Sequence, residues 1–108
     1  MDLSEYQDEA LVTAIESGDP VQDLHHYAFG VSDEAGEVSG AMKKYLRGDF
    51  DSQELRRRIK GEIGDTLWYL AVLADSLNFD LENVARANIA KLRDRDERGK
   101  ITGDGDNR

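Results

Sequence analysis

Apolar residues recur along the chain at helical spacing, and the pattern predicts four helices. Glycine, proline and capping residues mark the boundaries between the apolar segments. The expected helices run from Ser4 to before Gly18, from about Asp23 to Leu46, from after Asp51 to about Leu77, and from Asp80 as N-cap to about Arg98.

Polar residues at two of the expected starts fit capping boxes, in which two side chains satisfy free backbone N–H groups reciprocally. Ser4 with Gln7 fits this pattern for the first helix, and Asp51 with Glu54 fits it for the third. The first helix is short, and its inner face is expected to comprise Leu11, Ala14 and Ile15.

The stretch Arg47–Asp51 is the strongest break in the chain and predicts a turn between two long antiparallel helices. With one proline and few β-branched runs, the expected fold class is all-α. We expect a four-helix bundle-like single domain over residues 1–108, built on this central hairpin. Its helices are expected to bury two apolar stripes: Leu24, Ala28, Val31, Ala35, Val38 and Met42, then Leu55, Ile59, Ile63, Leu70, Leu73 and Leu77.

Composition narrows the functional classes. The net charge of −9 argues against a general nucleic-acid-binding role, because phosphate contacts need a basic face. The absence of cysteine excludes disulfides and thiolate metal sites. No apolar run approaches the length of a membrane span, and the acidic start lacks a signal-peptide pattern. A cytoplasmic location is the default expectation, although a chain whose signal had been removed would look the same.

Two acidic pairs with i, i+3 spacing flank the expected turn: Glu34 with Glu37, and Glu62 with Asp65. If the hairpin is centred between residues 49 and 50, Glu34 lies opposite Asp65 and Glu37 opposite Glu62. Four carboxylates would then meet roughly 20 Å from the turn. Oxygen-only ligands favour Mg²⁺, Mn²⁺ or Ca²⁺, so this pattern suggests a hard-metal site. The alternative is that the acids belong to solvated helix faces.

A second polar group lies on the last helix, where Asn88, Lys91 and Arg95 share one face. Either this strip contacts a nucleotide's sugar and phosphates, or Asn88 is a buried residue that fixes helix register. On the third helix, Tyr69 falls between Glu62 and Asp65 in angle and is a candidate substrate contact. Trp68 points well away from the acids and is expected to pack against another helix or subunit.

Three glycines and the end of the chain complete the unusual features. Gly30, Gly36 and Gly40 lie inside a helix, each costing up to about 1 kcal/mol relative to alanine, which suggests close helix approach or room for a ligand. His25 and His26 lack an obvious ligand partner. The tail ITGDGDNR is expected to be mobile from its composition.

Taken together, the ordered blocks EAGEV, EIGDTLWYLA, NIAKLRDR and GDNR resemble the MazG-like nucleoside triphosphate pyrophosphohydrolases. The resemblance covers most of the chain, from about Tyr27 to the tail. It implies an all-α enzyme, assembled as a dimer or tetramer, that uses Mg²⁺ (or Mn²⁺) to hydrolyse nucleoside triphosphates to a monophosphate and pyrophosphate. Such an activity would serve nucleotide-pool cleaning or regulation.

The resemblance also implies roles for individual residues. Glu34, Glu37, Glu62 and Asp65 match the metal-binding acids. The residues that match substrate-binding positions are Tyr69, Asn88 and Lys91, and Arg95 extends this strip. Lys44, seven residues after Glu37, is a further phosphate-binding candidate. Many relatives have two adjacent glutamates where this chain has Asp33 and Glu34. The shorter Asp33 puts in doubt the water-orienting role of the first of them, so either Asp33 or Glu37 would accept the proton of the attacking water.

Two other classes fit part of the pattern. A di-iron carboxylate bundle would normally draw histidines at Glu-x-x-His spacing, which neither acidic pair has. A non-catalytic helical module that binds metal or nucleotide, or serves assembly, would use the acids as surface charge. The amino-acid sequence does not identify the preferred base or sugar.

Overall fold

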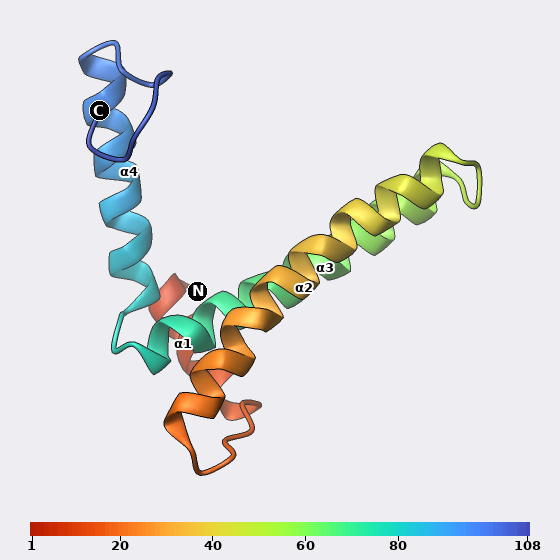
Figure 1. Cartoon of the computed structure of the whole chain (residues 1–108), viewed down its shortest axis with the longest axis horizontal. Coiled ribbons are helices and arrows are strands. Elements are labelled where there is room, and N and C mark those ends of the chain that lie inside the picture. Colours follow the sequence, from red (N-terminus) through yellow and green to blue (C-terminus); the bar gives the residue numbers. More distant parts are fainter.

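The computed structural model describes all 108 residues and contains four helices and no strand, which confirms the all-α fold class. The helices are α1 (Leu3–Val12), α2 (Pro20–Leu46), α3 (Ser52–Ser76) and α4 (Leu81–Glu97). α2 and α3 form the expected antiparallel hairpin, and its turn contains Gly48 at φ +88°, a conformation that favours glycine. Figure 1 shows this hairpin as the longest part of the molecule.

Every helix begins with an aspartate at the N-cap, whose side chain accepts a hydrogen bond from a backbone N–H of the first turn. Such a cap typically contributes about 1 kcal/mol. The caps at Asp51 and Asp80 were expected. The other two differ from expectation: Asp2 rather than Ser4 caps α1, and Asp19 caps α2, with Pro20 in the first helical position. α2 therefore begins three residues earlier than its apolar pattern indicated.

α1 packs against α3 through small side chains. The buried cluster consists of Ala10, Ala71, Ala74 and Leu81, and alanines at three of these positions let the helices approach closely. Trp68 packs against this cluster, and its indole N–H donates to the Ala10 carbonyl at 3.1 Å and to Thr13 Oγ1 at 2.8 Å. The expectation that Trp68 packs against another helix is confirmed.

Gln7 joins three parts of the chain and replaces the predicted capping box. Its side-chain amide donates to the carbonyl groups of Ala71 at 3.1 Å and Phe79 at 3.0 Å, and its oxygen accepts from the Leu81 N–H at 3.1 Å. Ser4 Oγ also serves this joint, because it donates to the Asp80 carboxylate at 2.8 Å. These hydrogen bonds fix the point from which α4 leaves the rest of the fold.

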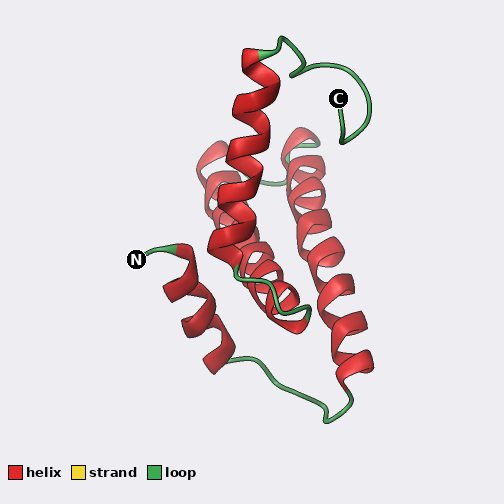
Figure 2. Ribbon diagram, turned by 90° about the vertical axis from the view of Figure 1, so that its left-hand side faces the viewer, coloured by secondary structure: helices red, strands yellow, loops and turns green.

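Beyond this joint α4 extends away from the hairpin, leaving a wide opening between them (Figure 1). Figure 2 shows that only loops connect the helices. α4 contacts α1 and α3 but not α2. The radius of gyration is 16.8 Å, compared with about 13 Å for a compact domain of this length. The accessible surface of 7891 Å² likewise exceeds the roughly 6,000 Å² typical of a monomer of this mass.

The expected apolar stripes are therefore only partly covered. Only 9 of 108 residues are buried, and in the hairpin Ile63 remains 59% and Leu70 39% exposed. Ala28, Ala35, Met42 and Leu77 are also exposed, contrary to expectation. The reason is geometric: each long helix has one neighbour along most of its length, so part of its apolar face has nothing to pack against.

Candidate metal centre

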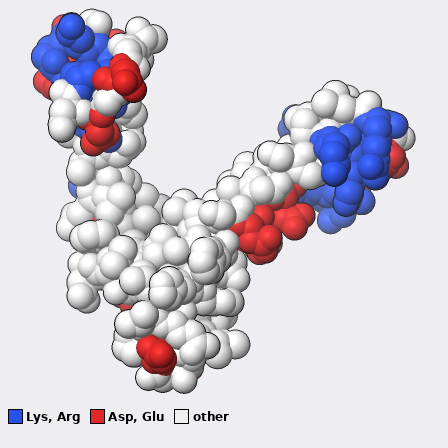
Figure 3. Space-filling view, in the orientation of Figure 1, with Lys and Arg blue, Asp and Glu red and all other residues white.

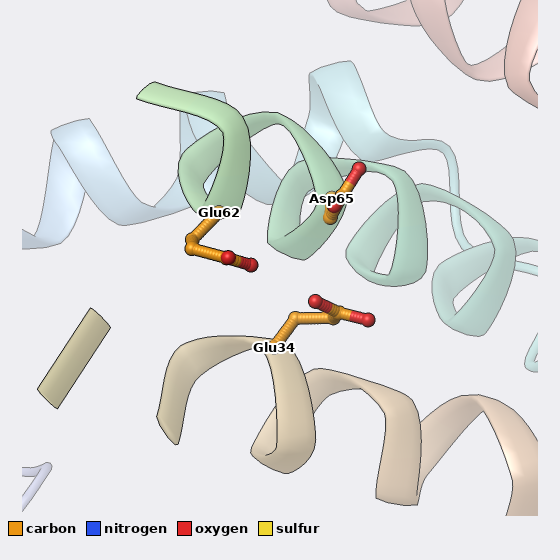
Figure 4. A group of neighbouring side chains, drawn as sticks. All are labelled: Glu34, Glu62 and Asp65. Carbon is orange, nitrogen blue, oxygen red and sulfur yellow. The ribbon is translucent and has the colours of Figure 1, made fainter. Parts of the chain in front are cut away.

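Three carboxylates converge at the middle of the hairpin. Glu34 projects from α2 toward Glu62 and Asp65 on α3, as Figure 4 shows. One oxygen from each side chain lies within 4.8 Å of the others. Glu34 and Glu62 are half-buried between the helices, and Asp65 is exposed. The arrangement is open on one side and offers only oxygen ligands, which suits a hard divalent cation.

Within this cluster, the carboxyl group with a shifted pKa is that of Glu34. Burial raises the pKa of its carboxyl, a hydrogen bond to Glu62 raises it further, and the charges of Asp65, Glu62 and Asp33 act in the same direction. Crowded carboxylates are relieved when one of them is protonated. A cation placed among them would relieve the same repulsion and would compete with that proton.

This competition leads to a pH prediction for the metal-free protein. A raised carboxyl pKa contributes stability that is present below the ordinary value of 4.5 and is lost as pH rises through the folded-state pKa. The Glu34→Gln variant lacks this group. Its melting temperature relative to the wild type should therefore increase from pH 4.5 toward neutral pH.

Thermal unfolding in metal-free buffer across this range measures the difference. A constant gap between the two proteins at every pH would show that Glu34 does not titrate abnormally. Adding Mg²⁺ should narrow the gap at neutral pH, because the cation stabilises the three carboxylates of the wild type more than the two that the variant retains.

Glu37 does not join the cluster, so the expectation of four carboxylates at one height is corrected to three. Glu37 is exposed on α2. Asp33 is also exposed, but its charge acts on Glu34. Both acids lie beside the cluster rather than in it.

An open pocket of about 280 Å³ adjoins the carboxylates and is lined by Glu34, Asp65, Trp68 and Tyr69. Tyr69 therefore lies beside the carboxylates, as its angular position on the helix predicted. Trp68 also borders this pocket, although it was expected to point well away from the acids. The two rings meet edge to face, with centroids 4.9 Å apart.

Gly30 explains how the Tyr69 ring is positioned. A Cβ added at Gly30 would lie 2.2 Å from a carbon of the Tyr69 ring, so the ring rests directly on the backbone of α2. The expectation of a close approach thus holds for this glycine, whereas Gly36 and Gly40 face open space. His26 meets the same ring edge to face at 6.1 Å, a contact that the amino-acid sequence gave no signal for.

The predicted phosphate-binding residues lie elsewhere in the molecule. Lys44 is exposed near the hairpin turn, where basic side chains gather next to acidic ones (Figure 3). Asn88, Lys91 and Arg95 lie on α4, across the opening from the hairpin. Asn88 is exposed rather than buried, so it is not a core residue that fixes register. Within one chain, the α4 strip and the carboxylates are not brought together.

The MazG nucleotide pyrophosphohydrolase domain matches residues 22–99 of the chain. The chain belongs to the MazG family. The matched region contains all three clustered carboxylates of this MazG protein, the aromatic pocket and the polar strip of α4. It ends before the glycine-rich tail, and α1 lies before it.

One relative matches the MazG chain along its entire length. The Gene 37 protein of Mycobacterium phage L5 is 41% identical over 115 aligned positions, which cover all of both chains. No solved structure matches the chain significantly. None of the helices is sufficiently long and apolar to cross a membrane.

Proposed function

We propose that this MazG protein hydrolyses ribo- or deoxyribonucleoside triphosphates to a monophosphate and pyrophosphate, in nucleotide-pool cleaning or regulation. The observation that carries the proposal is the convergence of Glu34, Glu62 and Asp65 beside an aromatic pocket in a chain of this family. Acids alone are common on helix surfaces. Here they come from two facing helices, and one of them, Glu34, has a raised pKa caused by burial and by its acidic neighbours.

The three carboxylates fit Mg²⁺, with Mn²⁺ as an alternative, because they supply oxygen ligands and a compensating negative charge. When bound, such an ion would neutralise phosphate oxygens and make a water molecule more acidic. Glu34, Glu62 and Asp65 would hold it. The cation would displace the proton that the raised pKa of Glu34 favours, since all three carboxylates would then be ionised.

Residues around the cluster would bind the substrate and move the proton. Asp33 and Glu37 are exposed on α2 on either side of Glu34, where a carboxylate can accept a proton from the attacking water. Tyr69 would contact the sugar or the base, held in its orientation by Gly30 and Trp68. Lys44, Asn88, Lys91 and Arg95 would hold the phosphates.

The separation of α4 from the carboxylates supports a homo-oligomer, a dimer or tetramer, in which a second copy supplies the missing contacts. The excess accessible surface of the single chain is about 1,900 Å², of the order that permanent homodimers bury. Light scattering at micromolar concentration should therefore give at least twice the chain mass of 12.1 kDa. A monomeric mass would contradict this assembly.

A nucleotide panel tests the activity. Purified protein with Mg²⁺ should release pyrophosphate and the corresponding monophosphate from at least one ribo- or deoxyribonucleoside triphosphate. Release of orthophosphate and a diphosphate would instead indicate cleavage of the terminal phosphate. If no nucleotide were cleaved, a binding or assembly module would be the better description.

A further inference from the structure

The C-terminal tail is folded back on α4 rather than extended from it. Gly99, Gly103 and Gly105 have positive φ angles of 68°, 133° and 85°, which permit the tight turns of this segment. Arg108 closes the loop, because its guanidinium donates to the carbonyl groups of Gly105 at 2.7 Å, Ile101 at 2.9 Å and Lys100 at 3.1 Å. The tail, which was expected from its composition to be mobile, is therefore held against α4 in this structure.

The folded tail places one carboxylate on the cations of α4. Asp106 Oδ1 lies 2.8 Å from Lys91 Nζ and 3.3 Å from Arg95 Nη2, and its backbone carbonyl also accepts a hydrogen bond from Arg95. Arg95 is only 5% exposed, as one of two buried polar residues in the chain. Further along, Arg98 donates to the Arg108 carbonyl at 2.6 Å. The basic end of α4 is therefore already engaged with an anion of its own chain.

We propose that the tail is an autoinhibitory strap, in which the Asp106 carboxylate occupies the positions on Lys91 and Arg95 that substrate phosphates take. This inference rests on the proposed function, because that function assigns phosphate binding to the same two cations. Substrate would bind by displacing Asp106, and the tail would then leave the face of α4.

Three properties of the tail suit a displaceable ligand. The Asp106 side chain is 78% exposed, so water can replace its contacts at little cost. The flanking glycines allow the segment to move without rearranging α4, whose last turn ends before Gly99. A polyphosphate carries more negative charge than one carboxylate and presents several acceptor oxygens to the same cations.

Asp106 also remains charged under working conditions. The hydrogen bond and charge of Lys91, followed by those of Arg95, lower the pKa of its carboxyl. The charged groups that face it are Lys91 and Arg95 on α4, and Figure 3 shows acidic and basic side chains mixed at this end of the molecule. Strap and phosphate therefore compete at neutral pH as two anions for one site.

The decisive variant is Asp106→Asn, which keeps the shape of the side chain but removes its charge. Asp104→Asn is the matched control: it makes the same charge change two residues away, at a side chain that forms no ion pair. The probe is inorganic pyrophosphate in buffer without divalent cations, so that the carboxylate cluster contributes nothing to binding. Calorimetry on the full chain measures the affinity.

We expect Asp106→Asn to bind pyrophosphate about fivefold more tightly than the wild type, because the anion that competes for Lys91 and Arg95 is removed. Asp104→Asn should change affinity less than about twofold, since its charge acts only through solvent. Adding Lys91→Ala to Asp106→Asn should cancel the gain, because the competition takes place at Lys91. In turnover assays, Asp106→Asn should lower KM and leave kcat unchanged.

Equal affinities for the two asparagine variants would overturn the strap, even if the wild type hydrolyses nucleotides normally. Weaker pyrophosphate binding by Asp106→Asn would also overturn it, since Asp106 would then help to build the anion site. Conversely, a fivefold gain in a protein that hydrolyses no nucleotide would support the strap and reject the proposed hydrolysis.

Discussion

Replacement of Glu62 by glutamine is expected to lower nucleotide turnover by at least about a hundredfold while the protein remains folded. Glu62 is one of only three carboxylates whose oxygens lie within 4.8 Å of one another. Glutamine keeps the shape of the side chain but removes a negative charge that a divalent cation needs. In the metal-free protein its amide can donate to the Glu34 carboxylate, which lies beside it in the cluster.

The stability of this variant distinguishes a metal ligand from a structural residue. Because carboxylate repulsion falls, the melting temperature of Glu62→Gln without metal should equal or exceed that of the wild type. Glu9→Gln, the same change at an exposed site on α1, is the control and should retain full turnover. Unfolding of Glu62→Gln would mean that Glu62 belongs to a buried polar network, and normal turnover would place the site elsewhere.

Removal of divalent cations is expected to abolish turnover completely, and Mg²⁺ or Mn²⁺ should restore it. The cluster contains neither sulfur nor nitrogen ligands, so hard cations are preferred. Binding to the folded state should also stabilise it by ~2.7 kcal/mol when the cation is present at a hundred times its dissociation constant. The melting temperature of the wild type should then rise by roughly 10 °C or more.

Adding the same cation to Glu62→Gln should give a much smaller increase in melting temperature, whereas Glu9→Gln should behave as the wild type. Full turnover in the presence of a chelator would contradict a metal centre. A rise in melting temperature of equal size in all three proteins would indicate that the cation acts at a site other than the cluster.

The hairpin and two of its acids could be predicted because the signals were local. The Arg47–Asp51 break and the caps Asp51 and Asp80 depend on residues a few positions apart. Counting from the turn then sufficed to place Glu34 opposite Asp65, and the structure brings these two together. The turn, these two caps and the pairing of Glu34 with Asp65 could therefore be predicted from residues close together in the chain.

The remaining errors concern contacts between distant segments. Ser4 and Gln7 fit a capping box, but both side chains instead bond to the α3–α4 region about 70 residues away. Glu37 lies outside the cluster although its spacing from Glu34 equals that between Glu62 and Asp65, so spacing along one helix does not reveal how two helices pack. The contact of the tail with Lys91 and Arg95 was not expected, because the composition of the tail does not indicate which distant residues lie near it.

The joint at Gln7 has a consequence for the order in which the chain folds. α2 and α3 are consecutive and can pair early, whereas the bonds of Gln7 to Ala71, Phe79 and Leu81 join residues more than 60 positions apart and need the hairpin to form first. The N-terminal helix and the base of α4 therefore become fixed in the same late step. Proteolysis in the native state should accordingly cut both regions at similar rates, ahead of the hairpin that they flank.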